Sequence, residues 1–331
     1  MKKFLSLLMA VMMMATVLAG CGGEKKDNTD APAPVDTDTV AVGAVLIARD
    51  DVPEEDIYTF VSTIFENVDT ITEQHAKGGE LDLEFASSVT SVPYHPGAAK
   101  YFEEKGYTVA SVKEGAGVGS SKSLTFGTGG ESGTYYAFGG VLASYVSNNS
   151  NVSVTAVTSD GSKANVEDLA AGTVQLAFVQ SDVMSYAYNG ERLFDTAVDG
   201  FSVVANLYME QVQIVTTNPD IKSVADLEGK KVSIGAAGSG VYFNAIDVLG
   251  VYGLSEDSIS AVYQSFGDSA DSLKDGKIDA AFIVAGAPTT AIVDLSTAGN
   301  VYLVSLDEEH TASLLEASPY YSAYTIPAGT Y

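Results

Sequence analysis

The chain has 331 residues, with 43 acidic against 17 basic side chains and a formal net charge of −26. An acidic field of this size disfavours nucleic-acid binding, because no basic patch is available to neutralise phosphates. The length exceeds that of one typical hydrophobic core, so two domains or lobes are expected.

The amino-terminal segment has the pattern of an export signal. Lys2 and Lys3 precede an apolar run over residues 4–18, which is too short to span a bilayer and is typical of a signal-peptide core. Residues 1–20 are therefore predicted to be a signal peptide. Leu18-Ala-Gly-Cys21 resembles a bacterial lipobox, which implies a lipid anchor at Cys21 on the extracytoplasmic side of the cell membrane. The alternative is an ordinary signal peptide with an incidental cysteine.

The segments that follow divide the first third of the chain. Residues 21–39 are rich in Asp, Pro, Ala and Thr and lack apolar periodicity, which predicts a solvated tether. The next apolar run predicts a strand over residues 40–50. Helices are expected after Pro53 and Pro96. Residues 111–123 contain mostly Gly, Ser and Lys and predict a linker. No second run of about 18 apolar residues appears, so no further membrane span is expected.

From residue 124 onward, short apolar runs alternate with helical segments. The runs lie at residues 124–126, 152–157, 176–179, 212–215, 232–234, 261–263, 280–284 and 301–304. Strands that alternate with helices predict an α/β fold in which largely parallel sheets are covered on both faces.

Two glycine-rich turns carry the clearest signal for a binding site. Residues 127–136 (GTGGESGTYY) and residues 235–240 (GAAGSG) each follow a strand and open a helix. Glycines let the backbone approach a ligand, and a helix start offers unpaired N–H groups at the positive end of the dipole. Neither turn matches the dinucleotide fingerprint or the phosphate-binding Gly-Lys-Ser/Thr motif. Each alone could be only a tight turn, but two of them in separate α/β units fit one ligand held between two lobes.

Any anion site in this chain has to be built from local dipoles. The overall charge would repel an anion, and loss of Lys2 and Lys3 with the leader would make the net charge −28. The chain has two arginines, Arg49 and Arg192, and neither is expected to be the main clamp on a carboxylate. Backbone N–H groups, Ser and Thr hydroxyls and Tyr are expected to bind the ligand instead.

Other polar residues give weaker signals. The three histidines share no metal-like spacing, Cys21 is the only cysteine, and no nucleophile–base arrangement or carboxylate pair predicts catalysis. Tyr135 and Tyr136 follow the first glycine turn and are either core residues or, for one of them, a ligand contact. Gln180 ends an apolar strand, where open α/β sheets place ligands.

Several segments together resemble one family of binding proteins. They are residues 124–136, 165–169 (NVEDL), 176–182 (LAFVQSD), 221–235 (IKSVADLEGKKVSIG), 238–240 (GSG), 279–288 (DAAFIVAGAP) and 326–331 (IPAGTY). The set resembles the TAXI family, the substrate-binding subunits of tripartite ATP-independent periplasmic (TRAP) transporters, over nearly all of the chain after the tether.

The resemblance implies both a fold and a function. The fold would be the two-lobed periplasmic-binding-protein fold, type II-like, with two α/β lobes joined by hinge strands. The function would be capture of a small carboxylate (glutamate-like, a dicarboxylate or a 2-oxo acid) for TRAP membrane permease subunits, without enzymatic activity. A binding protein of an ABC transporter or a ligand-sensing receptor domain would use the same fold and stays the alternative.

The glycine turns and the family segments define one set of candidate ligand contacts. These are Thr128, Gly129, Gly130, Thr134, Tyr135, Tyr136, Ser159, Asn165, Gln180, Ser181, Gly238, Ser239, Gly240, Gly286 and Pro288. No catalytic residue, metal ligand or cofactor is expected, and the protein is expected to act as a monomer.

The order of the segments departs from that of the family. The family ends with a strand, a helix and a Leu-His-Pro-Gly-Ala helix, whereas here the matching block, about residues 39–107 with Tyr94 in place of Leu, comes first. The sequence therefore resembles a circularly permuted member whose former termini are joined by residues 111–123. The alternative is a truncated gene after a coincidental insertion.

This permuted order makes each lobe nearly continuous in sequence. It predicts lobe 1 over residues 51–209 and lobe 2 over residues 210–331. Two extended segments, near residues 41–49 and 209–216, are expected to cross between them as hinges.

Overall fold

The computed structural model describes residues 35–331. The predicted signal peptide, the lipidation site Cys21 and most of the predicted tether lie outside the described residues. No helix within 35–331 is long and apolar enough to cross a membrane.

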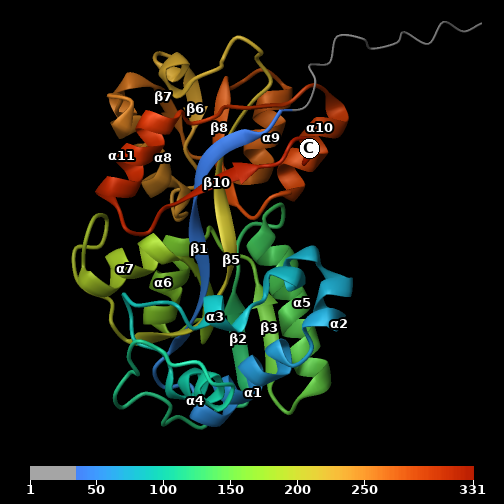
Figure 1. Ribbon diagram of the computed structural model, residues 1–331, viewed down its shortest axis with the longest axis vertical. Coiled ribbons are helices and arrows are strands. Elements are labelled where there is room, and N and C mark those ends of the chain that lie inside the picture. Colours follow the sequence, from blue (N-terminus) through green and yellow to red (C-terminus); the bar gives the residue numbers. More distant parts are fainter. Residues whose placement is uncertain (1–34) are drawn as a thin grey trace, which may run out of the picture. The chain divides into compact units, whose positions relative to one another are not determined.

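Two long antiparallel strands form the centre of the molecule. β1 (Thr37–Arg49) and β5 (Phe201–Thr216) pair from Arg49 opposite Phe201 to Ala41 opposite Gln211. Almost every residue of both strands is buried, which is typical of strands covered on both faces. Figure 1 shows the two strands running side by side through both groups of helices.

Both strands begin earlier than the sequence indicated. β1 starts at Thr37, inside the predicted tether, because its first residues pair with β10 (Ser322–Ile326) and this pairing buries Thr37 and Thr39. β5 starts at Phe201 and not near Met209. Polar threonines without apolar periodicity obscured the first boundary. At the second, Ser202 and Asn206 interrupt the apolar run, so the sequence did not indicate one long strand.

Lobe 1 contains three parallel strands beside the second half of β1. β2 (Ser123–Gly127) lies between β3 (Ser153–Val157) and β4 (Leu176–Gln180), and β4 pairs antiparallel with β1. Its helical segments are α1 (Glu54–Phe65), α2 (Val68–Gln74), η1 (Ala76–Glu80), α3 (Leu83–Ala86), α4 (Pro96–Glu104), α5 (Thr134–Asn149), α6 (Ser162–Ala171) and α7 (Ser181–Asn189).

Lobe 2 repeats this plan beside the second half of β5. β8 (Ala280–Ala285) pairs with β5, β6 (Lys231–Ser233) pairs with β8, and β7 (Ser260–Val262) lies at the edge. The remaining elements are β9 (Tyr302–Leu303), η2 (Val224–Leu227), η3 (Glu256–Ser258), α8 (Val241–Val251), α9 (Phe266–Lys274), α10 (Thr290–Ala298) and α11 (Glu308–Ala317).

Helix boundaries follow local sequence signals. α4 begins at Pro96, whose fixed φ suits a first helical position, and the Nδ1 atom of His95 accepts from the N–H of Gly97. Burial lowers the pKa of His95 to about 4, so this imidazole is neutral and structural. α6 and α7 end at Gly172 and Gly190, which adopt the left-handed conformation with φ of +79° and +70°.

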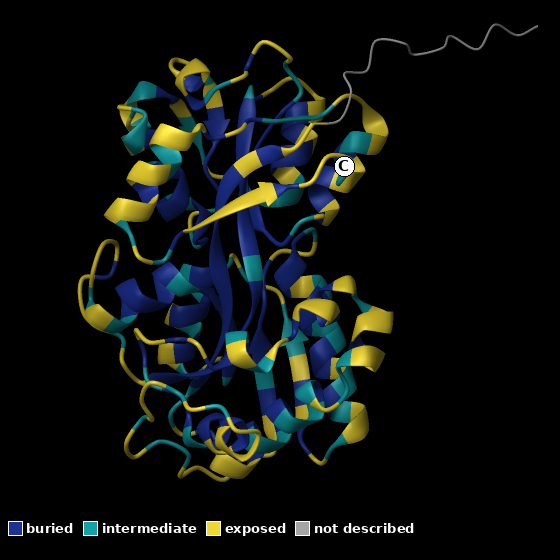
Figure 2. Ribbon diagram, viewed as in Figure 1, coloured by how far each residue is buried: buried dark blue, intermediate teal, exposed yellow. Residues whose placement is uncertain are grey.

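The hydrophobic core divides along the two central strands. One cluster contains apolar residues from Ala44 to Tyr208, together with Phe243, and covers lobe 1. Two further clusters contain Val40, Val42 and most of the buried apolar residues from Val212 onward. Figure 2 shows the central strands buried and the outer helix faces exposed. The predicted fold class, two α/β lobes joined by hinge strands, is confirmed.

The predicted linker is attached to lobe 1. Val112 forms a β-bridge with Tyr94, and the N–H of Gly117 donates to the carbonyl of Asp50 at 2.7 Å. The last predicted linker residue, Ser123, is the first residue of β2. The segment 111–123 therefore packs on the surface of lobe 1 over much of its length.

Candidate functional site

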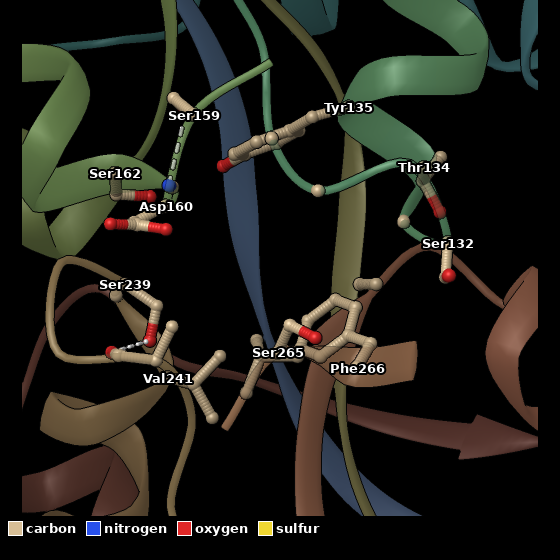
Figure 3. A pocket seen from close by; sticks show the side chains of 18 of the residues that line it. Ser132, Thr134, Tyr135, Ser159, Asp160, Ser162, Ser239, Val241, Ser265 and Phe266 are labelled. Carbon is tan, nitrogen blue, oxygen red and sulfur yellow. Dashed lines mark hydrogen bonds between the residues drawn. The ribbon is translucent and has the colours of Figure 1, made fainter. Parts of the chain in front are cut away.

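A cavity of about 120 Å³ lies between the two lobes. A cavity of this size accommodates a molecule on the scale of benzene or a small amino acid. Figure 3 shows hydroxyl-bearing side chains from both lobes around it. The lining residues are Gly129, Gly130, Glu131, Ser132, Gly133, Thr134, Tyr135, Ser159, Asp160, Gly161, Ser162, Gln180, Glu210, Ala236, Ser239, Gly240, Val241, Gln264, Ser265, Phe266, Gly267, Val284 and Ala285.

Three helices point uncapped amino termini at the cavity. The N-cap residues of α5, α6 and α8 are Gly133, Gly161 and Gly240, and none of them provides a side-chain hydrogen bond to the first turn. All three glycines line the cavity. The first N–H groups of a helix have no intrahelical acceptor and form the positive end of its dipole, which favours an anion. In α6 the N–H of Ala164 is already bound to the carbonyl of Gly238. α5 and α6 belong to lobe 1 and α8 to lobe 2.

The charged side chains of the lining are all acidic. They are Glu131, Asp160 and Glu210, and no Lys, Arg or His is among the lining residues. Arg49 forms a salt bridge with Asp51, and Arg192 forms one with Asp247. A negative group bound here would therefore be held by backbone N–H groups and hydroxyls and not by a basic side chain.

Glu210 is the buried member of the three acids. It lies on β5 opposite Val42 and is 2% exposed. Tyr135 Oη donates a hydrogen bond of 2.6 Å to its Oε2, and the Tyr135 ring stacks on Phe178 with centroids 4.6 Å apart. Burial raises the pKa of Glu210 to about 8, helped by the charge of Asp182 and opposed by the Tyr135 hydrogen bond and by Lys77.

On one side of the cavity the lobes are joined by a buried polar cluster. Gln180 Nε2 of lobe 1 donates to Asn244 Oδ1 of lobe 2 at 2.7 Å, and Asn244 Nδ2 donates to Asp182 Oδ2 at 2.9 Å. The N–H of Ala164 also donates to the carbonyl of Gly238. Phe243 of α8 belongs to the lobe 1 core cluster. Lobe 2 is thus docked on lobe 1 along this side.

On the other side the contacts involve the first glycine turn. Thr134 Oγ1 donates to the carbonyl of Gly286 at 3.0 Å, and the N–H of Ala291 donates to the carbonyl of Ser132 at 3.2 Å. The lobes therefore touch on both sides of the cavity.

The structure brings together about half of the candidate contacts. Those that line the cavity are Gly129, Gly130, Thr134, Tyr135, Ser159, Gln180, Ser239 and Gly240. They come from both glycine-rich turns and from the end of β4, and the two turns face each other across the cavity as their separate α/β units suggested.

Three of the other candidates shape lobe 1 without lining the cavity. Thr128 is buried and its hydroxyl donates to the carbonyl of Val157. Asn165 is buried and its Nδ2 donates to the carbonyls of Thr128 and Phe178. Ser181 accepts a hydrogen bond from the N–H of Gly43.

The remaining four candidates lie on the rim or between the lobes. Tyr136 is 36% exposed on the outer face of α5, because consecutive helical residues point about 100° apart. Gly238 and Gly286 lie in the interlobe contacts, and Pro288 is exposed beyond the second of these. None of the four is among the lining residues.

Sequence reasoning missed Glu210 as well as Ser162 and Ser265, which also line the cavity. A signal for Glu210 existed, since it is the one carboxyl of a strand that is otherwise uncharged, and buried carboxyls are costly unless they serve a purpose. The part of the chain that the structure describes has no group of three or more potential metal ligands.

The chain belongs to the NMT1-like family, whose model matches residues 26–106 and 126–331. Solved structures with a related fold include the aliphatic sulphonate binding protein SsuA from Escherichia coli, at 21% identity and a TM-score of 0.36, over 56% of this chain and 57% of that one.

Two further structures are similar to a comparable degree. The alkanesulfonate-binding protein SsuA from Xanthomonas axonopodis pv. citri, bound to MOPS, shows 20% identity and a TM-score of 0.40 over 57% of this chain and 62% of that one. The amino acid ABC transporter substrate-binding protein AbpA from Streptococcus pneumoniae shows 16% identity and a TM-score of 0.39 over 57% and 77%. The matched part is less than two thirds of either SsuA chain.

Proposed function

We propose that this chain is an extracytoplasmic, lipid-anchored solute-binding protein that captures a small organic carboxylate and presents it to TRAP membrane permease subunits. One observation carries the ligand class: three helix amino termini without side-chain caps, from both lobes, meet at one cavity. Such termini bind carboxylates without a basic side chain. The TAXI-like segments of the sequence favour the TRAP partner.

The proposed mechanism is closure around the ligand. α5 and α6 would hold the carboxylate from lobe 1, and α8 would complete the site only when lobe 2 closes. A ligand favours closure by its differential affinity for the closed over the open state. The closed outer surface is then what a permease would recognise.

A binding protein of an ABC transporter and a ligand-sensing receptor domain are the alternatives. The SsuA and AbpA structures carry names that describe sulfonate binding and arginine binding, and both chemistries would fit a cavity with helix dipoles and acidic groups. The adjacent gene discriminates between the transporters, because a large permease with many membrane spans indicates TRAP and an ATPase indicates ABC.

A thermal-shift screen tests the ligand class. Residues 35–331 are heated with amino acids, dicarboxylates, 2-oxo acids, 2-hydroxy acids and, as a comparison, neutral sugars. At least one carboxylate should raise the melting temperature in a concentration-dependent way, because binding only the folded state stabilises it. Stabilisation by sugars alone would refute a carboxylate site.

The lipid anchor is tested separately on the full chain expressed in bacteria. Labelled palmitate should enter the wild-type protein, which should sediment with membranes. Cys21→Ser should lose both the label and the sedimentation. Equal labelling of the two proteins would show that the predicted lipidation of Cys21 is wrong.

We also propose that the chain is circularly permuted relative to the TAXI family. The end of β10 and the start of β1 lie together, since Ile326 pairs with Thr37 and the N–H of Ala328 donates to Asp36 Oδ1 at 2.8 Å. A family chain that ran from the segment after β10 directly into β1 would need only a short connection.

A further inference from the structure

The carboxyl group of Glu210 has no role in the proposed binding of a carboxylate. Glu210 lies on β5 where the hinge strands cross from one lobe to the other, and it lines the cavity while being 2% exposed. Glu131 and Asp160, the other acids of the lining, are exposed. In its charged form Glu210 would repel a simple anion, so an ionised carboxyl at this place suits only a ligand that also carries a positive group.

A carboxylate is suited to bind an ammonium group, because a hydrogen bond between opposite charges is roughly twice as strong as one between neutral groups. We infer that Glu210 accepts the ammonium group of the ligand, so that the cavity selects an α-amino acid with a single carboxylate over dicarboxylates and 2-oxo acids. This inference rests on the proposed function, since it assigns the second pole of the same cavity.

The positive pole of the site is formed by helix termini and the negative pole by a side chain on a strand. The amino termini of α5, α6 and α8 provide the positive pole, and Glu210 with its partner Tyr135 Oη provides the negative pole. A zwitterion satisfies both poles at once. A volume of about 120 Å³ leaves room for a small side chain beyond the zwitterionic group.

A second carboxylate would have no favourable partner. No basic side chain is among the lining residues, and Glu131 and Asp160 lie at the rim. An anionic side chain would therefore lose its hydration and meet like charge, which costs free energy that the helix termini, already engaged with the first carboxylate, do not offset. The site thus disfavours glutamate and 2-oxoglutarate.

Binding an ammonium group at Glu210 should release a proton. Burial raises the pKa of Glu210 to about 8, so the group is mostly protonated at pH 7. The groups that face it are Tyr135 from α5 and Lys77 from η1, which favour the charged form, and Asp182 from α7, which opposes it. An ammonium ion at the carboxyl lowers its pKa and the proton leaves.

The sign of the pH dependence follows from this proton release. The affinity for an amino acid should rise by about tenfold per pH unit between pH 6 and pH 7 and level off above pH 8, where Glu210 is already charged. A 2-oxo acid should behave in the opposite way, because only the protonated carboxyl can donate a hydrogen bond to its oxo oxygen, so its affinity should fall above pH 8.

The experiment compares acids that differ only in the group at the α carbon. The probes are L-alanine with pyruvate, L-leucine with 4-methyl-2-oxopentanoate, and L-glutamate with 2-oxoglutarate, titrated calorimetrically into residues 35–331 at pH 6, 7 and 9. Buffers with different ionisation enthalpies report the proton release. L-Alanine or L-leucine should bind about 10–100-fold more tightly than its oxo partner, and L-glutamate should bind more weakly than both.

Glu210→Gln tests the residue itself. Gln keeps the size and can still accept the hydrogen bond from Tyr135 but cannot carry charge. The variant should lose about 10–100-fold in affinity for the amino acid, lose the proton release and leave the oxo acid within about threefold. Glu103→Gln, at an exposed position of α4, is the matched control and should change none of these. Thermal unfolding without ligand verifies that both variants fold.

The outcomes separate this inference from the proposed function. Equal binding of the amino acid and its oxo partner, or equal losses for both in Glu210→Gln, would overturn the role of Glu210 while the carboxylate site stands. Absence of binding by every acid in the three pairs would overturn both proposals.

Discussion

A Gly240→Ala substitution is expected to weaken ligand binding by about 10–100-fold while leaving both lobes folded. Gly240, the N-cap of α8 in lobe 2, lies so close to lobe 1 that a Cβ atom there would be 1.4 Å from Gln180 Oε1 and 3.1 Å from Ser162 Oγ. Overpacking of this kind costs about 1–3 kcal/mol, and here the cost falls on the closed state.

Relief by movement of Gln180 would itself be costly. The side chain is 2% exposed and its Nε2 hydrogen bond to Asn244 joins the lobes. Rotation away from the new methyl group would break that bond and leave buried polar groups unpaired. The open state has no such contact, so the substitution shifts the hinge equilibrium toward opening.

Gly250→Ala provides the matched control, because it lies in the same helix and its Cβ would meet nothing within 4 Å. Calorimetric titration gives the affinities, and small-angle scattering with ligand reports whether the lobes close. A Gly240→Ala protein that binds within twofold of the control would show that this contact does not limit closure.

The sequence predicted the site best where the signal is carried by the backbone. Glycines between a strand and a helix usually indicate a tight turn whose backbone can approach a ligand. Both such turns line the cavity, at Gly129 and Gly240. The third uncapped helix start, at Gly161, was missed because a single glycine before Ser162 looks like any loop. Its place in the site depends on packing between elements that are distant in sequence.

Side-chain roles were harder to predict than backbone roles. Asn165 and Tyr135 look equally suited to a polar ligand. Asn165, however, donates to two backbone carbonyls of its own lobe, while Tyr135 reaches the cavity. Tyr136 differs from Tyr135 only by its direction on the helix. Glu210 is the one carboxyl of its strand, and the pairing of β5 with β1 shows that it lies at the crossing of the lobes.

Contacts between the lobes could not be predicted from local sequence patterns. Gly238 and Gly286 were predicted to touch the ligand because they lie in family segments, and the structure places both in interlobe hydrogen bonds. A close approach of backbones and a ligand contact both favour glycine, so the residue type alone does not separate the two roles.

Moving residues 36–114 to the end of the chain and deleting them should have opposite effects on folding. A protein in which residues 124–331 precede residues 36–114 is expected to fold into the same two lobes and bind the same ligand with similar affinity. It keeps the Tyr94–Val112 bridge and all pairings of β1, since the new junction falls where Ala328 already contacts Asp36. Loop-closure cost changes by only about 0.6 kcal/mol per doubling of loop length.

Deletion of residues 36–114 should instead unfold lobe 1. The deletion removes β1, which pairs with β4, β5 and β10, together with α1 and α4, whose Phe60 and Phe102 are fully buried in the lobe 1 core. The burial free energy lost with this apolar surface should exceed the free energy of unfolding of a typical domain, about 5–15 kcal/mol. Circular dichroism, thermal unfolding and calorimetric titration of the two proteins side by side measure the contrast. If the deletion protein melts cooperatively and still binds the ligand, residues 36–114 form an accessory domain. If the reordered protein fails to fold, the chain is not a circular permutation of the family order.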